Sequence, residues 1–346
     1  MPGTDGKVLI TGGSGFIARH LVLRLLSEGR EVCILDLFEP PPELAAVSFV
    51  QGDVRDPGAA RTALGGCDEV FHLAAAHHDY GLSRDTFFSV NETGMRVLCE
   101  AMRDQGVSRI CFTSTVAVFG DAPGPHVEGA PPHPVTPYGE SKLAAERVLE
   151  DWVLAAPNRH ALILRPTVVF GPHNFANMFA LIRQIRRGLF LQVGDGANVK
   201  SVAYVENLVD AALQLWTRAD AAPFEVFNIA DKPDLTSRQI AEVIFAALGR
   251  RPSPVHIPLA AAVAAAWPFD LVSALTGRPL PVSRQRVRKF AAMETRYESD
   301  KLLATGFRAR LSIEEGLRRT VEWFLREGER AIPRVHLPPA TVGGPQ

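Results

Sequence analysis

The sequence predicts an α/β fold, in which a doubly wound parallel sheet is followed by a smaller, mostly helical C-terminal lobe. Short, continuously apolar runs alternate with longer amphipathic runs through the first half of the chain. This alternation is typical of parallel strands that are buried on both faces and joined by helices. Beyond residue 171, helical periodicity dominates and proline-containing links separate the helices. The length of 346 residues corresponds to about two domains.

The elements follow in order along the chain. Strand-like apolar runs lie at 7–11, 31–36, 47–51, 69–73, 109–113 and 159–165. Apolar residues at helical spacing predict helices at 16–26, 86–105 and from Tyr138 onward, and then at 178–187, 206–218, 237–248 and 312–327. We expect residues 1–170 to form the sheet domain, to which later segments return, and residues 171–330 to form the second lobe. The proline- and glycine-rich residues 331–346 are expected to form a flexible tail.

Composition and charge narrow the class of protein. Apolar residues make up 47% and charged residues 22% of the chain, which excludes disordered and fibrous proteins. The formal net charge of −1 gives no support for nucleic-acid binding. The four cysteines form no CxxC pair, so we expect reduced thiols rather than disulfides or a zinc site. Without a signal-like N-terminus or an apolar run of about 18 residues, a cytoplasmic protein is expected.

A glycine-rich turn lies directly between the first predicted strand and the first predicted helix. Gly12 permits a tight turn, and Gly15 lets the backbone approach a pyrophosphate. The helix that begins at Phe16 and Ile17 offers free N–H groups and a partial positive charge to the phosphates. The position of this turn after a strand and before a helix predicts a dinucleotide-binding, Rossmann-type domain.

Acidic residues after the next two strands indicate which dinucleotide binds. Asp36 ends the second strand, where a carboxylate accepts hydrogen bonds from both adenosine ribose hydroxyls and repels a 2′-phosphate, so NAD is expected rather than NADP. Arg19 is the one residue that favours NADP. Asp53, followed by Val54, is a candidate for the adenine amino group. A helix N-cap formed with residues 55–56 is the alternative role for Asp53.

Tyr138 and Lys142 lie four residues apart, on one face of a predicted helix. A free tyrosine has a pKa near 10 and is a poor base at neutral pH, but a neighbouring ammonium favours the phenolate. Such a phenolate removes a hydroxyl proton while hydride leaves the same carbon. The end of the fifth strand, residues 112–115, can supply a hydroxyl that shares this proton. The combination predicts an oxidoreduction step on an alcohol.

The glycine turn, Asp36, residues 114–120, Tyr138 with Lys142 and residues 164–172 together resemble an extended short-chain dehydrogenase/reductase of the NAD-dependent epimerase/dehydratase family. The resemblance implies a Rossmann-type NAD domain and chemistry on sugar nucleotides. It places Thr115 at the family's catalytic serine or threonine and implies that Lys142 also holds the nicotinamide ribose. It further implies cofactor contacts at Leu73, Ala74, Ala75, Thr113 and Val168.

The second half has a narrower resemblance. Residues 174–178, 193–207, 231–235 and 269–277 are similar to bacterial 4-epimerases of undecaprenyl-diphosphate-linked N-acetylglucosamine, which serve O-antigen and related polysaccharide assembly. The resemblance implies a diphosphate-linked sugar as substrate, and we expect a homodimer. Lys200 stands where many sugar-nucleotide epimerases carry an arginine, so it keeps the charge but loses the bidentate fork. The candidate substrate residues are His77, Thr115, Asn177, Lys200 and Arg286 or Arg288.

His77 is followed by His78 and Asp79 at the end of the fourth strand. Adjacent histidines on an extended segment point apart, and no further cysteine, histidine or acidic cluster accompanies them. We therefore expect no metal site, and we expect His77 to line the cleft near the sugar.

Residues 259–267 form an apolar stretch too short to span a bilayer. Residues 250–330 hold 15 Lys and Arg against 9 Asp and Glu, a local charge of about +6. An apolar stretch in a basic lobe suits a polyprenyl-linked diphosphate and peripheral association with the inner face of the membrane. An ordinary core helix and a solvated basic face are the alternative interpretations.

Three functions are considered for these residues. The first is an NAD-dependent sugar 4-epimerase that acts through a transient 4-keto sugar. The second is a net oxidoreductase, such as a 4-keto-sugar reductase or a 3β-hydroxysteroid-type dehydrogenase. The third, a non-enzymatic dinucleotide sensor, conflicts with the intact set of Thr115, Tyr138 and Lys142, because binding alone needs no phenolate.

Overall fold

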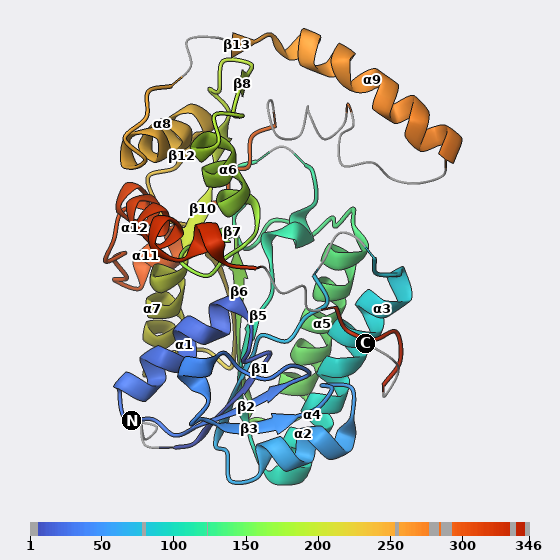
Figure 1. The fold of residues 1–346 in the computed structure, drawn as a ribbon. Coiled ribbons are helices and arrows are strands. Elements are labelled where there is room, and N and C mark those ends of the chain that lie inside the picture. Colours follow the sequence, from blue (N-terminus) through green and yellow to red (C-terminus); the bar gives the residue numbers. More distant parts are fainter. Residues whose placement is uncertain are drawn as a thin grey trace.

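The main sheet contains seven parallel strands among the residues that the computed structural model describes, which are 6–77, 81–122, 124–252, 256–276, 284, 293–332 and 337–342. The strand order is β11-β6-β5-β4-β1-β2-β3 (Figure 1). The strands are β1 (Val8–Thr11), β2 (Val32–Asp36), β3 (Ser48–Gln51), β4 (Glu69–His72), β5 (Arg109–Thr113), β6 (His160–Pro166) and β11 (Phe224–Ile229). The first six are the predicted strands. The order reverses between β1 and β4, where open parallel sheets bind ligands beyond the carboxyl ends of their strands.

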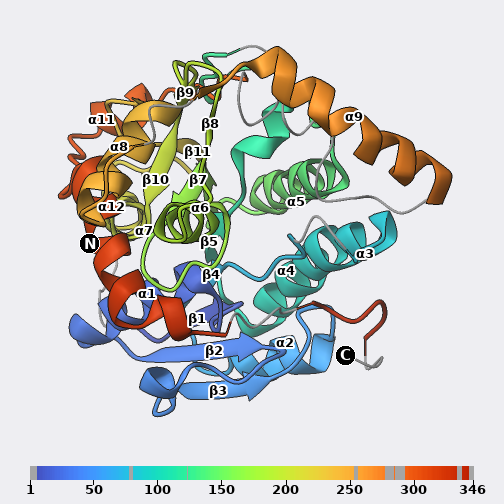
Figure 2. The same ribbon diagram turned by 45° about the horizontal axis from the view of Figure 1, so that its top comes forward.

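Helices cover both faces of this sheet (Figure 1, Figure 2). One hydrophobic core joins the sheet to α1 (Phe16–Ser27) and α7 (Val205–Trp216). A second core joins the opposite face to α2 (Pro57–Leu64), α4 (Gly94–Gln105) and α5 (Pro137–Leu154). The predicted doubly wound fold is therefore confirmed.

Two details of the helices differ from the sequence prediction. The helix predicted over 86–105 consists of α3 (Arg84–Phe88), a π-helical turn (Ser89–Thr93) and α4. The short helix α2 has no counterpart among the predicted helices, because its eight residues make barely two turns and give little helical periodicity. Its N-terminus is fixed instead by the Asp56 side chain, which accepts a hydrogen bond from the Gly58 amide.

The second lobe is mostly helical, as predicted. Its core is buried between α6 (Asn177–Arg186), α8 (Ser237–Ala247) and α12 (Ile313–Arg326). Short strand pairs complete it: β7 (Val168–Phe170) with β10 (Val202–Tyr204), β9 (Val199–Lys200) with β12 (Leu235–Thr236), and β8 (Gln192–Val193) with β13 (His256–Ile257). The remaining helices are α9 (Leu259–Thr276), α11 (Asp300–Ala304) and the 3-10 turns Pro42–Leu44, Val116–Phe119 and Gly328–Arg330.

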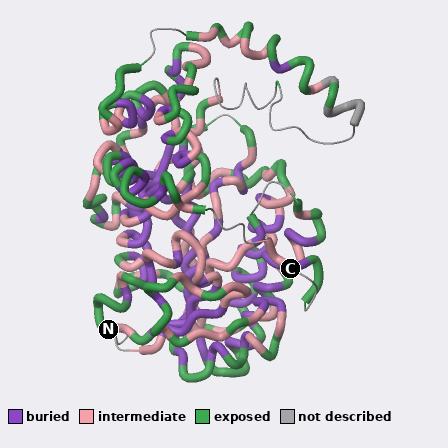
Figure 3. Tube along the Cα trace, viewed as in Figure 1, coloured by how far each residue is buried: buried purple, intermediate pink, exposed green. Residues whose placement is uncertain are grey.

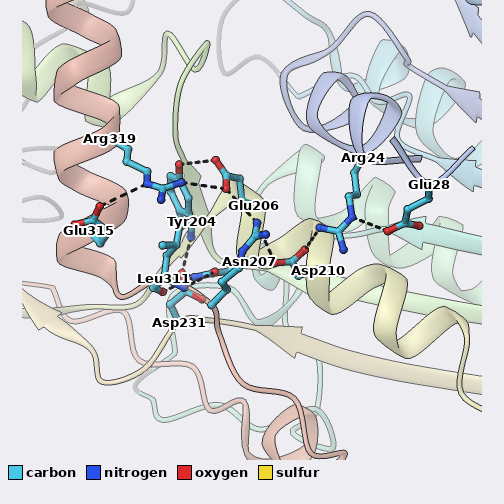
Figure 4. Close-up of polar contacts among 11 residues, drawn as sticks. Arg24, Glu28, Tyr204, Glu206, Asn207, Asp210, Asp231, Leu311, Glu315 and Arg319 are labelled. Atoms are coloured by element: carbon cyan, nitrogen blue, oxygen red, sulfur yellow. Dashed lines mark hydrogen bonds and ion pairs between the residues drawn. The ribbon is translucent and has the colours of Figure 1, made fainter. Parts of the chain in front are cut away.

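A buried polar network fastens the second lobe to the sheet domain (Figure 4). The Asp231 carboxylate accepts hydrogen bonds from the Tyr204 amide at 2.7 Å and from Asn207 Nδ2 at 3.0 Å. One turn after Asn207, Asp210 pairs with Arg24 of α1 at 2.8 Å. Burial raises the pKa of Asp231 to about 6. The network thus connects α1, α7 and the strand end after β11.

Buried residues follow the strands and the inner faces of the helices, whereas α9 is mostly exposed (Figure 3). Along α9, Ala266 is the buried position among the side chains that the structure describes. No helix in the described part of the chain is long and apolar enough to span a bilayer.

Candidate active site

The glycine turn joins β1 to α1 with no room for a side chain. Gly12 has a left-handed φ of +70°, and a Cβ at Gly12 would lie 2.6 Å from the amide nitrogen of Ala74. The Leu73 amide donates to the Thr11 carbonyl at 3.0 Å. The predicted cofactor-contact segment 73–75 is therefore packed directly against the turn. Such close backbone packing is what a dinucleotide pyrophosphate requires of this loop.

The N-terminus of α1 points into the same place. Gly15 is its N-cap, so no side chain caps this end, and no acidic residue lies in its first turn. Phe16 and Ile17 form the first turn, where the Phe16 ring packs edge-on against His20 at 5.6 Å. An uncapped helix end with its positive partial charge fits an anionic pyrophosphate.

Asp36 lies beside the turn, as predicted. Its carboxylate accepts hydrogen bonds from the amides of Ser14 and Phe38, each at 3.0 Å. Arg19, the residue that favoured NADP, forms an ion pair with Glu43. The carboxylate is therefore at the turn, while the guanidinium is engaged by the segment after β2.

Asp53 forms a buried ion pair with Arg55, whose Nη2 lies 2.6 Å from Oδ2. The alternative role of Asp53 as a helix N-cap is wrong, because Asp56 caps α2. Arg55 also donates to the carbonyls of Pro339 and Ala340, at 2.9 and 3.2 Å. Residues 337–342 thus lie against this edge of the sheet domain. The adenine contact of Asp53 and the flexibility of the tail stay predictions.

The catalytic candidates lie on α5. Thr136 caps the helix by accepting from the Gly139 amide, which places Tyr138 in the first turn and Lys142 one turn later. Lys142 is 1% exposed, and its Nζ donates to the Thr113 carbonyl at 2.6 Å. The ammonium also lies 4.1 Å from the centre of the Phe112 ring. Burial lowers the pKa of Lys142 to about 7. The Lys142 amine is therefore anchored to the end of β5, and it gains and loses its charge near neutral pH.

Tyr138 is half-buried at the edge of a small apolar cluster. Its ring centre lies 6.4 Å from that of Phe87. Val54, a predicted cofactor contact, is buried in the same cluster with Ala76 and Val90. The cluster fixes the first turn of α5 against the segment that follows β4.

Two adjacent hydroxyl groups at the end of β5 have different surroundings. Ser114 is buried, and its hydroxyl donates to Glu146 at 2.5 Å. Thr115 is half-buried and caps a 3-10 turn, where its Oγ1 accepts from the Ala117 amide at 3.1 Å. Accepting that bond leaves the Thr115 hydroxyl proton available to a substrate oxygen. The geometry therefore favours Thr115 over Ser114 as the hydroxyl that shares the substrate proton.

Sequence reasoning missed two groups behind the site. Glu146, one turn after Lys142, is held by Arg165 through both carboxylate oxygens, at 3.0 and 2.5 Å. In the sequence, the repeated spacing of four residues from Tyr138 to Lys142 to Glu146 indicates that all three lie on one face of the helix, so it could have shown that Glu146 lies behind the site. Asn91, in the π-helical turn, bonds both backbone groups of Ala76. No periodicity marks Asn91, because the turn that presents it departs from α-helical geometry.

The other predicted residues lie around the same edge or in the second lobe. Val168 begins β7 and is 47% exposed. Lys200 Nζ donates to the Met293 carbonyl at 2.7 Å, and Asn177 is exposed at the start of α6. His77 is exposed at the end of a described segment. Arg286 and Arg288 lie outside the described residues. Within the described part of the chain, no three metal-ligating side chains come together.

The chain resembles known enzymes over nearly its whole length. Residues 8–230 match the model of the NAD dependent epimerase/dehydratase family. The N-acetyl-alpha-D-glucosaminyl-diphospho-ditrans,octacis-undecaprenol 4-epimerase of Escherichia coli O157:H7 is 37% identical over 92% of this chain and 95% of its own length. A 2-alkyl-3-oxoalkanoate reductase of Stenotrophomonas maltophilia is 30% identical over 90% and 98%.

Among solved structures, the UDP-glucose 4-epimerase of Thermus thermophilus in complex with NAD aligns with a TM-score of 0.72 and 26% identity. The alignment covers 93% of this chain and 99% of that one. The family match, the relatives and the site geometry agree, and the chain belongs to the NAD-dependent epimerase/dehydratase family.

Proposed function

We propose that this chain is an NAD-dependent 4-epimerase of a diphosphate-linked N-acetylhexosamine. Four observations support the proposal: Lys142 donates to the carbonyl that ends β5, Tyr138 lies one turn earlier on α5, Thr115 follows β5, and the uncapped glycine turn ends β1, two strands away in the same parallel sheet. The 37% identical relative is a 4-epimerase of an undecaprenyl-diphosphate-linked sugar, which supports both the reaction and the class of substrate.

The residues around the glycine turn suit NAD. The amides of the first turn of α1 would receive the pyrophosphate, and Asp36 would receive the adenosine ribose hydroxyls. Lys142 would hold the nicotinamide ribose from the end of β5. When bound, NAD⁺ would accept the hydride from the sugar C4, and the reduced cofactor so formed would return it to the opposite face of the 4-keto sugar.

The protein's own groups manage the proton of the C4 hydroxyl. Tyr138 takes the O4 proton, while the Thr115 hydroxyl donates a hydrogen bond to the same oxygen. The ammonium of Lys142 favours the Tyr138 phenolate by its charge. After the 4-keto sugar turns over in the cleft, Tyr138 returns the proton to O4. Asn177 and Lys200, with Arg286 or Arg288, are proposed to hold the sugar and its diphosphate.

The carrier, location and assembly form the finer part of the proposal. A polyprenyl carrier is favoured over UDP by the named relative. Because such a lipid lies in a bilayer, we expect a cytoplasmic protein that works at the inner face of the cell membrane. We also expect it to be a homodimer. Static light scattering of the purified protein tests the dimer: a single mass equal to one chain would contradict it.

A net reductase is the second candidate, because one relative is a 2-alkyl-3-oxoalkanoate reductase with 30% identity over 98% of its length. The two functions differ in cofactor turnover. An epimerase returns each hydride to the sugar and consumes no cofactor, whereas a reductase oxidises one reduced nicotinamide for each product.

The decisive experiment offers UDP-N-acetylglucosamine and the polyprenyl-diphosphate sugar side by side to the purified protein. We expect tightly bound NAD, released on denaturation, and conversion of the polyprenyl-linked sugar to its C4 epimer without net change in NADH absorbance. Tyr138→Phe should keep the NAD and lose about 10²- to 10⁴-fold in rate. The matched variant Tyr204→Phe removes a phenol that bonds Glu206 in the second lobe, so its turnover should be retained. Steady consumption of NADH would instead identify a reductase.

A further inference from the structure

Helix α9 exposes apolar side chains in different directions. The exposed fractions are 53% for Trp267, 45% for Phe269 and 47% for Val272. At about 100° per residue, Trp267 and Phe269 lie on nearly opposite sides of the helix. A helix that is apolar on all sides is normally buried in a protein core or in lipid. Helix α9 contributes to none of the three hydrophobic cores described above, so its exposed Trp267 and Phe269 side chains are available to an apolar partner.

The position of α9 leaves this surface accessible. In both ribbon views the helix reaches out from the second lobe, over the side of the molecule where α3 and α5 lie (Figure 1, Figure 2). A groove of about 680 Å³ runs along it, lined by Leu259, Ala260, Val263, Ala264, Trp267 and Arg284. With 18 residues the helix is about 27 Å long, and it does not qualify as a membrane span.

The charged residues in the sequence of α9 and its flanking segments indicate the kind of partner. In the sequence, residues 250–292 carry a single acidic residue, Asp270. Asp270 pairs with Arg284. The basic residues of this segment are Arg250, Arg251, Arg278, Arg284, Arg286, Arg288 and Lys289. The helix itself carries no Lys or Arg, and the basic residues flank it in the sequence. An apolar helix with aromatic side chains and flanking cations fits a lipid surface, where the acyl chains cover the apolar side chains and the cations meet anionic headgroups.

We infer that α9 docks the chain on an anionic lipid bilayer by lying within the boundary between headgroups and acyl chains, where lipid covers Trp267 on one side of the helix and Phe269 on the other. A second copy of the chain suits this surface less, because it would bring two strongly basic segments together. A single isoprenoid chain would fill the groove but leave the other side of the helix exposed. The reason why the chain would dock on a bilayer rests on the proposed function, because a polyprenyl-linked sugar is presented at a bilayer surface.

Co-sedimentation with vesicles tests the inference. The full chain is incubated with phosphatidylcholine vesicles, with and without phosphatidylglycerol. We expect binding at least ten-fold stronger with phosphatidylglycerol, and loss of that difference at about 1 M salt, where the Debye length is about 3 Å. Of the four tryptophans, Trp267 alone is exposed, since the others are 3–8% exposed. Its emission should therefore shift to shorter wavelength on anionic vesicles.

The variant Trp267→Glu/Phe269→Glu should lose at least ten-fold in vesicle binding. Leu154→Glu is the matched control, because Leu154 is apolar and 79% exposed at the end of α5, and it should bind as the unaltered chain does. Unchanged binding by the double variant, equal binding to both vesicles, or an unshifted tryptophan emission would each overturn the inference. A lower molecular mass of the double variant in light scattering would show that a second copy covers α9 instead, which also overturns it.

A separate measurement keeps this inference distinct from the proposed function. The double variant is assayed with the polyprenyl-diphosphate sugar dissolved in detergent, where no bilayer is needed. Turnover retained in detergent but lost on anionic vesicles supports α9 as the docking element. Normal vesicle binding by the unaltered chain without epimerisation of either sugar would leave the docking intact and refute the 4-epimerase.

Discussion

Replacement of Gly12 by alanine tests the dinucleotide turn at its most constrained point. Gly12 has a φ of +70°, and a Cβ there would lie 2.6 Å from the nitrogen and 2.7 Å from the Cα of Ala74. Both neighbours are backbone atoms, so no side chain can rotate away. The overlap is relieved only when the turn and the segment after β4 move apart.

Two costs add at this position. An alanine in the left-handed region costs about 1–2 kcal/mol, and an extra methyl group in a packed site costs about 1–3 kcal/mol. Gly12→Ala should therefore lower the free energy of unfolding by ~2–5 kcal/mol. Because the displaced segments form the pyrophosphate site, the steric part should also weaken NAD⁺ binding by roughly 5- to 150-fold.

Gly29 provides the matched control. It has a φ of +77°, and a Cβ there would meet nothing within 4 Å. Gly29→Ala should lose about 1–2 kcal/mol of stability and no affinity for NAD⁺. Urea unfolding and calorimetric titration with NAD⁺ measure the two quantities. Equal NAD⁺ affinity of the two variants would refute the assignment of the turn to the pyrophosphate.

Three further predictions concern the site and its support. Thr115→Val should lower kcat by about 10²- to 10³-fold, while Thr115→Ser stays within a few-fold; equal losses would remove the hydroxyl from the reaction. The folded pKa of Lys142, about 7 against 10.5, means that the charged lysine costs stability below pH 7 and that this cost fades as pH rises toward 10.5. Lys142→Met should thus raise the free energy of unfolding at pH 6, measured in urea, by up to ~5 kcal/mol, and it should lose turnover. A lower free energy of unfolding would contradict the burial argument. The folded pKa of Asp231, about 6 against 3.8, means that stability falls as pH rises through that window. Asp231→Asn should gain up to ~3 kcal/mol at pH 7 and nothing near pH 3.5, and a loss at pH 7 would show that its hydrogen bonds outweigh the burial of the charge.

The sequence predicted those parts of the fold and site that depend on local pattern. Buried parallel strands leave apolar runs, which is why six strands of the main sheet were predictable. The four-residue spacing of Tyr138 and Lys142 follows from helix geometry, and α5 places both in its first turns. In contrast, β11 (Phe224–Ile229) joins the sheet by pairing with β6. This contact is long-range, and the short apolar run of β11 does not predict it.

Long-range contacts also explain what sequence reasoning missed in the site. Local pattern alone does not separate Ser114 from Thr115, whereas in the structure Ser114 donates to the buried Glu146 carboxylate and Thr115 caps a 3-10 turn. Asn91 owes its position to a π-helical turn, and Arg55 reaches the carbonyls near residue 340 across most of the chain. Such partners are determined by tertiary packing, which periodicity does not encode.

The distribution of partners around Lys142 explains how its charge stays effective. Glu146 follows it by one helical turn, where a carboxylate would ordinarily pair with the ammonium. Its oxygens are instead taken by the Arg165 guanidinium and the Ser114 hydroxyl. Lys142 is held by the Thr113 carbonyl and the Phe112 ring, neither of which carries a formal charge. The Lys142 side chain is therefore fixed in place without a direct bond to a carboxylate, and in its protonated form its charge can favour a phenolate at Tyr138.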